Sequence, residues 1–426
     1  MMPLTKEQNY WRKRIFLLTW IAYAGFYFGR KNLSVTWSSI EADLGMSESD
    51  YAGIIFVYSL IYTIGQFTNG YLSDTFGPRK VVTIGLFMAA LANLFLGMSF
   101  SIGIMIFLIA INGYGQSTGW SGLVKNMTPW FRANERGIVM SWWSTCYVIG
   151  GFLATVFATY VAFDMDFLSE WGWKRGFIFP SLILFVIAII YMLFTRNSPE
   201  EINVPTIIES KYEFKSDGKS EKHKILGLLL KNRALWIYSG CYMILKLIRY
   251  AFLFWLPIYL VKALSYDVNE AGYVSSVYEL VGFLGVIIAG YASDRIFGSK
   301  RFSTIAIMML FLGFVCLMHP YLVSFGKIGT IVSIALIGMA TYGPDSLICT
   351  AGSMDVGGKK GAAMAAGIIN GMGSIGQMVS GFVVIYINER YGWDNLFNFF
   401  VILALIGGGV AALKWNFKSP EKQLEC

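Results

Sequence analysis

The chain has 426 residues, of which 56% are hydrophobic and 14% are charged, and its formal net charge is +8. Because soluble globular chains carry about 25% charged residues, this composition excludes a single water-soluble core and indicates that the bilayer is the solvent. The basic residues are spread over short loops between apolar segments, which is typical of cytoplasmic loops of membrane proteins and argues against nucleic acid as a partner.

Apolar segments along the chain predict twelve transmembrane helices. Six lie at about 15–38, 50–71, 81–99, 102–123, 137–163 and 176–194, and six more lie at about 234–262, 270–291, 303–325, 328–350, 361–387 and 395–414. The segment between the two sets is too charged to enter lipid and too long for a tight turn. We therefore expect an all-α membrane protein with an N-terminal six-helix half at 1–194, a linker at 195–232 and a C-terminal six-helix half at 233–426.

Loop charges predict how the chain is oriented in the membrane. Basic residues gather in alternate loops, for example at Arg79 and Lys80 and again at Lys300 and Arg301, and also in the linker. The loops between them are acidic, as at 41–50 and 164–170. By the positive-inside rule, both termini and the linker are expected in the cytoplasm, with the protein in the cell (inner) membrane.

The two halves repeat one another at a fixed offset. The sequence Gly-Tyr-Leu-Ser-Asp at 70–74 recurs as Gly-Tyr-Ala-Ser-Asp at 290–294, and each copy is followed by a basic pair. Gly-Trp at 172–173 recurs as Gly-Trp at 392–393. A shared offset of 220 positions indicates an internal duplication. Two parallel pseudo-symmetric halves imply a substrate site near the bilayer midplane and transport by alternating access.

Several ionisable residues fall inside the predicted spans: Arg30, Lys31, Lys246, Arg249 and Glu279, with Asp345 as a further candidate. A charged side chain at the bilayer centre costs roughly 2.5–3.5 kcal/mol on insertion scales, so each of these residues indicates a cavity or a charged partner.

Arg30 and Arg249 are 219 positions apart and so occupy equivalent places in the two halves to within one residue. Each lies on a helical face with two other candidate residues, and the full sets are Tyr23, Tyr27 and Arg30, and Tyr242, Lys246 and Arg249. Two symmetry-related arginines predict a clamp for a tetrahedral dianion, because the planar guanidinium fork matches phosphate oxygens and stays charged.

The alternative is that each arginine neutralises a nearby carboxylate, for which Glu279 is the first candidate. Asp345 follows Gly343-Pro344, where a broken helix could face water. Three motif residues at the cytoplasmic boundary, Asp74, Arg79 and Asp294, are expected to act as gates or helix tethers rather than as substrate ligands. No nucleophile–base pair, metal-ligand cluster or nucleotide motif occurs, so neither an enzyme nor a cofactor or metal is expected.

The segment 70–80 resembles the signature between helices 2 and 3 of the major facilitator superfamily. More specifically, Tyr-Phe-Gly-Arg-Lys-Asn at 27–32, the segment 112–120 and the segment 247–260 resemble the organophosphate:phosphate antiporters of that superfamily. The likeness covers nearly the whole chain. It implies the major facilitator fold, a phosphate site at Arg30 and Arg249, and nearby family tyrosines at Tyr23, Tyr27 and Tyr62.

Three positions depart from that family. Gln66 replaces a helix-2 lysine, Cys146 falls where the glycerol-3-phosphate and hexose-phosphate carriers have a histidine, and Lys246 stands in place of a tyrosine. Lys246 lies one turn from Arg249 on the same helical face and is therefore a candidate for a third cation that replaces the one missing at Gln66.

We therefore predict a monomeric secondary antiporter that exchanges a small organophosphate, of the sugar phosphate, glycerol phosphate or phosphoglycerate class, for inorganic phosphate. Two alternatives remain open. One is a membrane sensor of extracellular sugar phosphate with the same fold, and the other is a transporter of another organic anion that is coupled to protons through Glu279 or Asp345.

Overall fold

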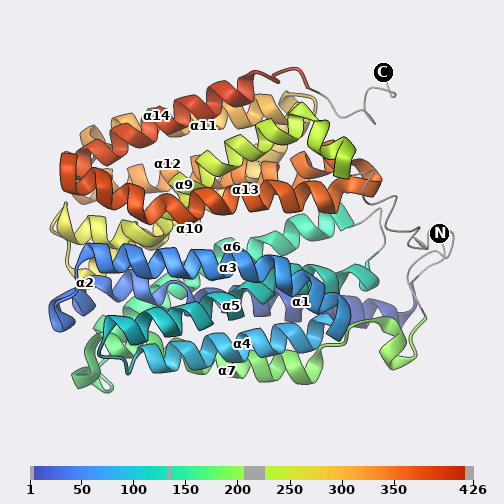
Figure 1. The fold of residues 1–426 in the computed structure, drawn as a ribbon, viewed down its shortest axis with the longest axis horizontal. Coiled ribbons are helices and arrows are strands. Elements are labelled where there is room, and N and C mark those ends of the chain that lie inside the picture. The colour runs from blue at the N-terminus through green and yellow to red at the C-terminus, as the bar shows by residue number, and fades with distance from the viewer. Residues whose placement is uncertain (1–3, 132–135, 206–225, 418–426) are drawn as a thin grey trace. The chain divides into compact units, whose positions relative to one another are not determined.

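A computed structural model describes residues 4–131, 136–205 and 226–417. The described residues form helices and no strands (Figure 1). They fall into two compact units, Met1–Phe214 with Tyr266–Ser276, and Lys215–Ser265 with Val277–Cys426. The middle of the predicted linker, 206–225, and the tail after residue 417 lie outside the described residues, so the three-part division 1–194, 195–232 and 233–426 stays a prediction.

The first unit contains the helices α1 (Lys6–Phe26), α2 (Asn32–Leu44), α3 (Glu48–Phe76), α4 (Pro78–Leu96), α5 (Ile102–Met127), α6 (Arg136–Thr159) and α7 (Arg175–Phe194). Within it, α4 packs against α5 and α7, and α1 packs against α5, α6 and α7 (Figure 1). Side-chain caps fix two helix starts, since Thr5 and Ser47 each form a capping box at the N-terminus of α1 and α3.

The second unit contains the helices α9 (Arg233–Lys262), α10 (Val268–Tyr291), α11 (Arg301–Val323), α12 (Gly326–Leu347), α13 (Ser353–Tyr391) and α14 (Trp393–Ala412). Helix α9 packs against α13 and α14, and α11 packs against α12 and α14 (Figure 1). The segment Tyr266–Ser276, which includes the first turns of α10, groups with the first unit, and within it Asn269 and Tyr273 both donate hydrogen bonds to Asp164.

Ten helices in the described part of the chain are long and apolar enough to cross a membrane. The two other predicted spans are the first, which is interrupted, and α5, which carries Asn112, Gln116 and Asn126. With these two, each half has six membrane-spanning segments. The prediction of an all-α membrane protein with twelve transmembrane helices is confirmed.

The predicted first span, 15–38, is interrupted and is not one continuous helix. Helix α1 ends at Phe26, a 3₁₀ turn covers Tyr27–Gly29, and α2 begins at Asn32. The predicted first span therefore consists of two helices joined by a 3₁₀ turn. The interruption falls at Arg30, one of the two candidate phosphate ligands.

Both glycines of the Gly-Trp repeat have a positive φ angle. Gly172 and Gly392 have φ angles of 51° and 79°, a region that a residue with a Cβ atom rarely adopts. Each precedes the last helix of its half, α7 or α14. The sequence duplication is thus accompanied by a glycine with positive φ before the last helix of each half.

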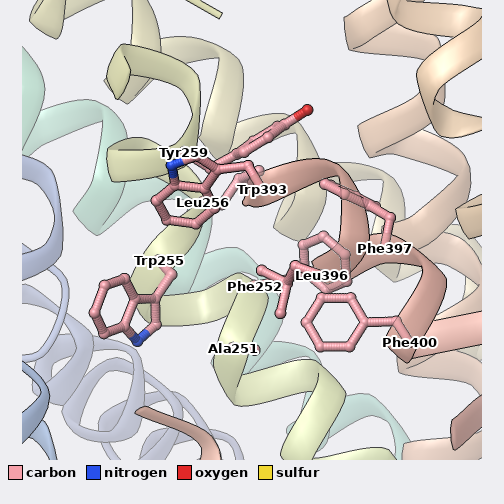
Figure 2. A pocket seen from close by; sticks show the side chains of 9 residues that line it. All are labelled: Ala251, Phe252, Trp255, Leu256, Tyr259, Trp393, Leu396, Phe397 and Phe400. Carbon is pink, nitrogen blue, oxygen red and sulfur yellow. The ribbon is translucent and has the colours of Figure 1, made fainter. Parts of the chain in front are cut away.

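An aromatic cluster fills the space between α9 and α14 in the second unit. Figure 2 shows its lining residues, which are Ala251, Phe252, Trp255, Leu256, Tyr259, Trp393, Leu396, Phe397 and Phe400. The cavity between them has a water-accessible volume of about 10 Å³, close to the minimum for a single water molecule. This cluster contributes helix packing and leaves no room for a phosphate ester.

Candidate functional site

The break between α1 and α2 is stabilised by side-chain amides from α5. In a regular helix the carbonyl of Phe26 would accept from the N–H of Arg30, but that N–H bonds to Tyr27 O instead, at 3.0 Å. Gln116 Nε2 takes its place and donates to Phe26 O at 2.8 Å. Because lipid offers no donors, such replacement bonds are what makes an interrupted helix tolerable in a membrane.

The carbonyl of Gly29 is satisfied in the same way. It accepts hydrogen bonds from Asn112 Nδ2 at 2.8 Å and from Asn93 Nδ2 at 3.2 Å. Asn32 at the start of α2 donates to Asn93 Oδ1 at 2.8 Å. These asparagines are all buried, so they form a polar network that holds the break rather than a solvated surface.

Arg30 lies at this break and is buried, with a relative exposure of 6%. Its Nε and Nη2 atoms donate to Gln116 Oε1 at 3.2 and 3.0 Å. The guanidinium carbon lies 4.6 Å from the ring centre of Tyr27 and 5.3 Å from that of Tyr62. Among the residues that the structure describes, no carboxylate forms an ion pair with Arg30.

The predicted tyrosines of the first unit surround Arg30. Tyr23 packs edge-on against Tyr27, with ring centres 6.1 Å apart, and also against Trp120 at 5.3 Å. Tyr62 comes from α3 and stacks on Tyr58. All of these tyrosines are buried. The ring faces of Tyr27 and Tyr62 stabilise the buried cation of Arg30 by cation–π interaction without neutralising it.

Arg249 in α9 has different surroundings. Its Nη1 forms an ion pair with Asp345 Oδ1 at 2.8 Å, and the two side chains are only 6% and 3% exposed. The guanidinium carbon lies 4.6 Å from the ring centre of Tyr342. Helix α9 is continuous through Arg249. The two arginines are therefore equivalent in sequence, but one has a neutral hydrogen-bond partner and the other has a carboxylate.

Asp345 does not lie at a broken helix. Helix α12 runs without interruption through Gly343 and Pro344 to Leu347, and a π-helical segment follows at Ile348–Gly352. The expectation of a break facing water at this position is wrong. Asp345 is 2% exposed and is directed at Arg249.

Lys246 lies one turn before Arg249 and is 5% exposed. Its Nζ lies 4.8 Å from the ring centre of Tyr242 and 6.0 Å from that of Tyr250. Gly373 of α13 leaves the space for this arrangement, since a Cβ atom there would lie 2.9 Å from Lys246 Cδ. Glu279 in α10 is fully buried.

The motif repeated at 70–80 and 290–301 makes contacts within its own half of the protein. In the second unit, Arg301 pairs with Asp294 at 2.5 Å and with Asp355 at 3.6 Å, and so connects the end of α10 to the starts of α11 and α13. In the first unit, Arg79 donates to the carbonyl of Met192. The side chain of Asp74 lies outside the described part of the structure.

Gln116 and Asn93 were not among the residues predicted for the site. A signal for the first was present, because Asn112 and Gln116 share one face at a spacing of i, i+4 in an otherwise apolar segment. Asn93 is an isolated amide in its own segment and carries no such signal. Its partners come from α2, α5 and the 3₁₀ turn at Tyr27–Gly29, so only the tertiary structure reveals its role.

Comparison with known proteins gives a consistent result. The sequence model of the Major Facilitator Superfamily matches residues 19–350 and 241–425. The chain is 29% identical to the glycerol-3-phosphate transporter of Bacillus subtilis (strain 168), over 95% of this chain and 92% of that protein. It is 26% identical to the membrane sensor protein UhpC of Escherichia coli (strain K12), over 98% and 94%.

Among solved structures, the chain is similar to a bacterial homologue of the human lysosomal transporter Spinster in an inward-facing, unoccupied conformation. The TM-score is 0.77 with 13% sequence identity, and the match covers 95% of this chain and 97% of the other. At this level of identity the likeness shows the fold alone.

Proposed function

Because the chain belongs to the Major Facilitator Superfamily, we propose that it is a multi-pass membrane transporter that exchanges a small organophosphate for inorganic phosphate. Transport proceeds by alternating access, in which the two halves expose one site first to one side of the membrane and then to the other. The drive is the phosphate gradient, and no cofactor takes part.

One observation carries this proposal. Arg30 is a permanently charged group, 6% exposed in a membrane-spanning segment, whose polar partner in the described part of the chain is the neutral amide of Gln116. A buried charge without a counter-charge is expensive, so it is kept where an anion binds during function. The guanidinium offers the fork geometry that suits phosphate oxygens.

The helix break adds to the attraction for an anion. The N-terminal end of α2 begins at Asn32, two residues after Arg30. Such an end carries a partial positive charge and backbone N–H groups that lack carbonyl partners, which is how interrupted helices bind anions within membranes. Arg30 and the start of α2 are thus expected to bind the phosphoryl group together.

In the second half, Arg249 is the proposed second ligand of the phosphoryl group and Lys246 the third cation. Tyr23, Tyr27 and Tyr62 shape the wall around Arg30. The glycerol-3-phosphate transporter among the relatives supports an organophosphate as the organic substrate. Because Gln66 and Cys146 alter the surroundings of the site relative to that family, glycerol 3-phosphate is only one candidate, with sugar phosphates and phosphoglycerates as the others.

The loop charges support a place in the cell (inner) membrane with both termini in the cytoplasm. We further propose that the transporter works as a monomer, since the candidate ligands Arg30 and Arg249 both come from one chain.

The proposal is tested by reconstituting the purified protein in liposomes loaded with inorganic phosphate and adding labelled phosphate outside. An exchanger takes up label, and unlabelled organophosphates compete with it according to their affinity. The same protein with Arg30→Lys is the matched variant and is expected to show little uptake. If the native protein takes up no more label than empty liposomes do, the proposal is contradicted.

A second candidate is a membrane sensor, because the chain is also similar to the membrane sensor protein UhpC. A sensor binds organophosphate but transports little or none. Binding measured on the purified protein, together with absent exchange in liposomes, would favour that function.

A further inference from the structure

The two arginines differ in their polar partners. Arg30 hydrogen-bonds to an amide, whereas Arg249 Nη1 holds the carboxylate of Asp345 at 2.8 Å. Both partners of this ion pair come from the same unit, Arg249 from the middle of α9 and Asp345 from the second half of α12.

The Asp345 carboxylate resembles the ligand that Arg249 is proposed to bind. A carboxylate and a phosphoryl group both present anionic oxygens to a guanidinium, and they use the same N–H donors. Oδ1 of Asp345 accepts a hydrogen bond from Nη1 of Arg249. Nη1 carries two N–H groups, and a phosphoryl oxygen that binds to the one directed at Asp345 takes the place of this carboxylate oxygen.

We propose that Asp345 is an internal competitor of the substrate for Arg249 and thereby sets the affinity and the release rate of phosphate. This inference rests on the proposed function, since it takes Arg249 as a phosphate ligand. In the empty protein Asp345 neutralises Arg249 and avoids the cost of a second unpaired buried cation. On binding, the phosphoryl group displaces it, and on release its return to Arg249 helps to expel the product.

The competitor weakens binding and favours turnover. A transporter that binds phosphate with two uncompensated arginines would hold it tightly in both orientations of the site, and tight binding in the ground state slows release. Breaking the Arg249–Asp345 pair costs free energy, so the net binding of phosphate is weaker. Phosphate is then released more quickly, and exchange stays fast. Asp345 is in this sense a residue that tunes affinity without itself contacting the substrate.

The first test compares Asp345→Asn with the native protein. The amide keeps the shape of the side chain but removes the competing charge, so the dissociation constant of inorganic phosphate for the purified protein is expected to fall by about tenfold. Exchange in liposomes is expected to show a lower KM and a lower maximal rate. Asp345→Glu keeps the charge and should have a KM near that of the native protein.

The matched control is Asp294→Asn, which removes a carboxylate from another arginine pair of the same unit, Asp294 with Arg301. It should leave phosphate affinity unchanged. If Asp345 merely fastens α12 to α9, Asp345→Asn will lower thermal stability in detergent without tightening phosphate binding, and that result would overturn the inference.

A second measurement uses the native protein. A hydrophobic carbodiimide modifies carboxyl groups within membranes, and the modification of Asp345 is followed by peptide mass spectrometry with Asp294 as the reference. Displacement by phosphate should increase the modification of Asp345, whereas a permanent ion pair predicts no increase and would also overturn the inference.

The two proposals fail in different ways. If Arg249→Lys binds and exchanges phosphate like the native protein, Arg249 is not a phosphate ligand, and the proposed site fails together with the competitor. If Arg249→Lys loses binding but Asp345→Asn does not tighten it, the proposed site stands and only the competitor is excluded.

Discussion

At the scale of single residues, the neighbourhood of each arginine determines its charge balance. Arg30 and Arg249 were predicted as a symmetrical pair from their offset of 219 positions. Their burial is indeed nearly the same, at 6% and 5% exposure, but the first contacts Gln116 and the second Asp345. Burial thus follows the internal repeat, whereas the partner in each half is specific to that half.

The first prediction concerns Arg30. Arg30→Lys keeps the positive charge but loses the two-pronged contact that Nε and Nη2 make, and we expect exchange to fall by at least about tenfold, with the protein still inserted in the membrane. The fall in exchange is measured with labelled phosphate in liposomes. Arg390→Lys, at an exposed arginine whose side chain donates a hydrogen bond to Tyr386, is the control and should transport normally.

The second prediction concerns Lys246. If Lys246 replaces the cation missing at Gln66, Lys246→Tyr should weaken substrate affinity by about tenfold, and adding Gln66→Lys should recover much of it. If instead Lys246 serves to pair with Glu279, the loss will be relieved by Glu279→Gln and not by Gln66→Lys. Substrate affinity and expression level of the single and double variants are the measurements. Rescue by the Glu279 change alone would exclude the compensation.

At the scale of elements, the position of the helix break depends on where replacement hydrogen bonds exist. Proline at 344 lacks an N–H, and a break was expected beside it, yet α12 remains helical. In a membrane an interrupted helix needs other donors for its carbonyls. The break occurs instead at Tyr27–Lys31, where Gln116, Asn112 and Asn93 supply those donors.

The third prediction tests this account at Gly29. A Cβ atom there would lie 2.6 Å from Asn93 Nδ2 and 2.9 Å from Leu184 Cδ1, so Gly29→Ala must push apart the amides that satisfy the break. We expect a loss of stability of about 1–3 kcal/mol and, because Gln116 also holds Arg30, a marked loss of exchange. Thermal unfolding in detergent and liposome exchange measure the two effects.

The control for Gly29→Ala is Gly103→Ala, in the first turn of α5, where no atom lies within 4 Å of the added Cβ. This variant should be as stable as the native protein. If Gly29→Ala transports and unfolds like Gly103→Ala, the amide network does not hold the break.

At the scale of the whole molecule, the fourth prediction concerns coupling. An exchanger driven by internal phosphate should take up organophosphate rapidly into phosphate-loaded vesicles, and a protonophore should leave this uptake nearly unchanged. Vesicles without phosphate are the control and should take up little. Uptake that collapses with the protonophore and ignores internal phosphate would favour the proton-coupled alternative, with Glu279 or Asp345 as the proton carrier.

The sequence by itself determined the class of the protein. Apolar segments of membrane-spanning length leave helices as the structure, because a lipid environment requires every backbone group to bond within its own segment. The fixed offset between the Gly-Trp copies at 172 and 392 predicted two similar halves, and both glycines have a positive φ angle. Buried Arg30, Lys246 and Arg249 were also identified, since a charge inside an apolar segment is conspicuous in sequence.

What the tertiary structure alone decided is which partner each buried charge has and where the first helix breaks. Asp345 is 96 positions from Arg249, and Gln116 is 86 positions from Arg30. Spacing along one helix defines a face, but contacts between helices depend on packing angle and rotation, which periodicity does not specify. For the same reason Asn93 gave no signal in sequence, since its role arises only where α4 lies against the backbone carbonyl of Gly29.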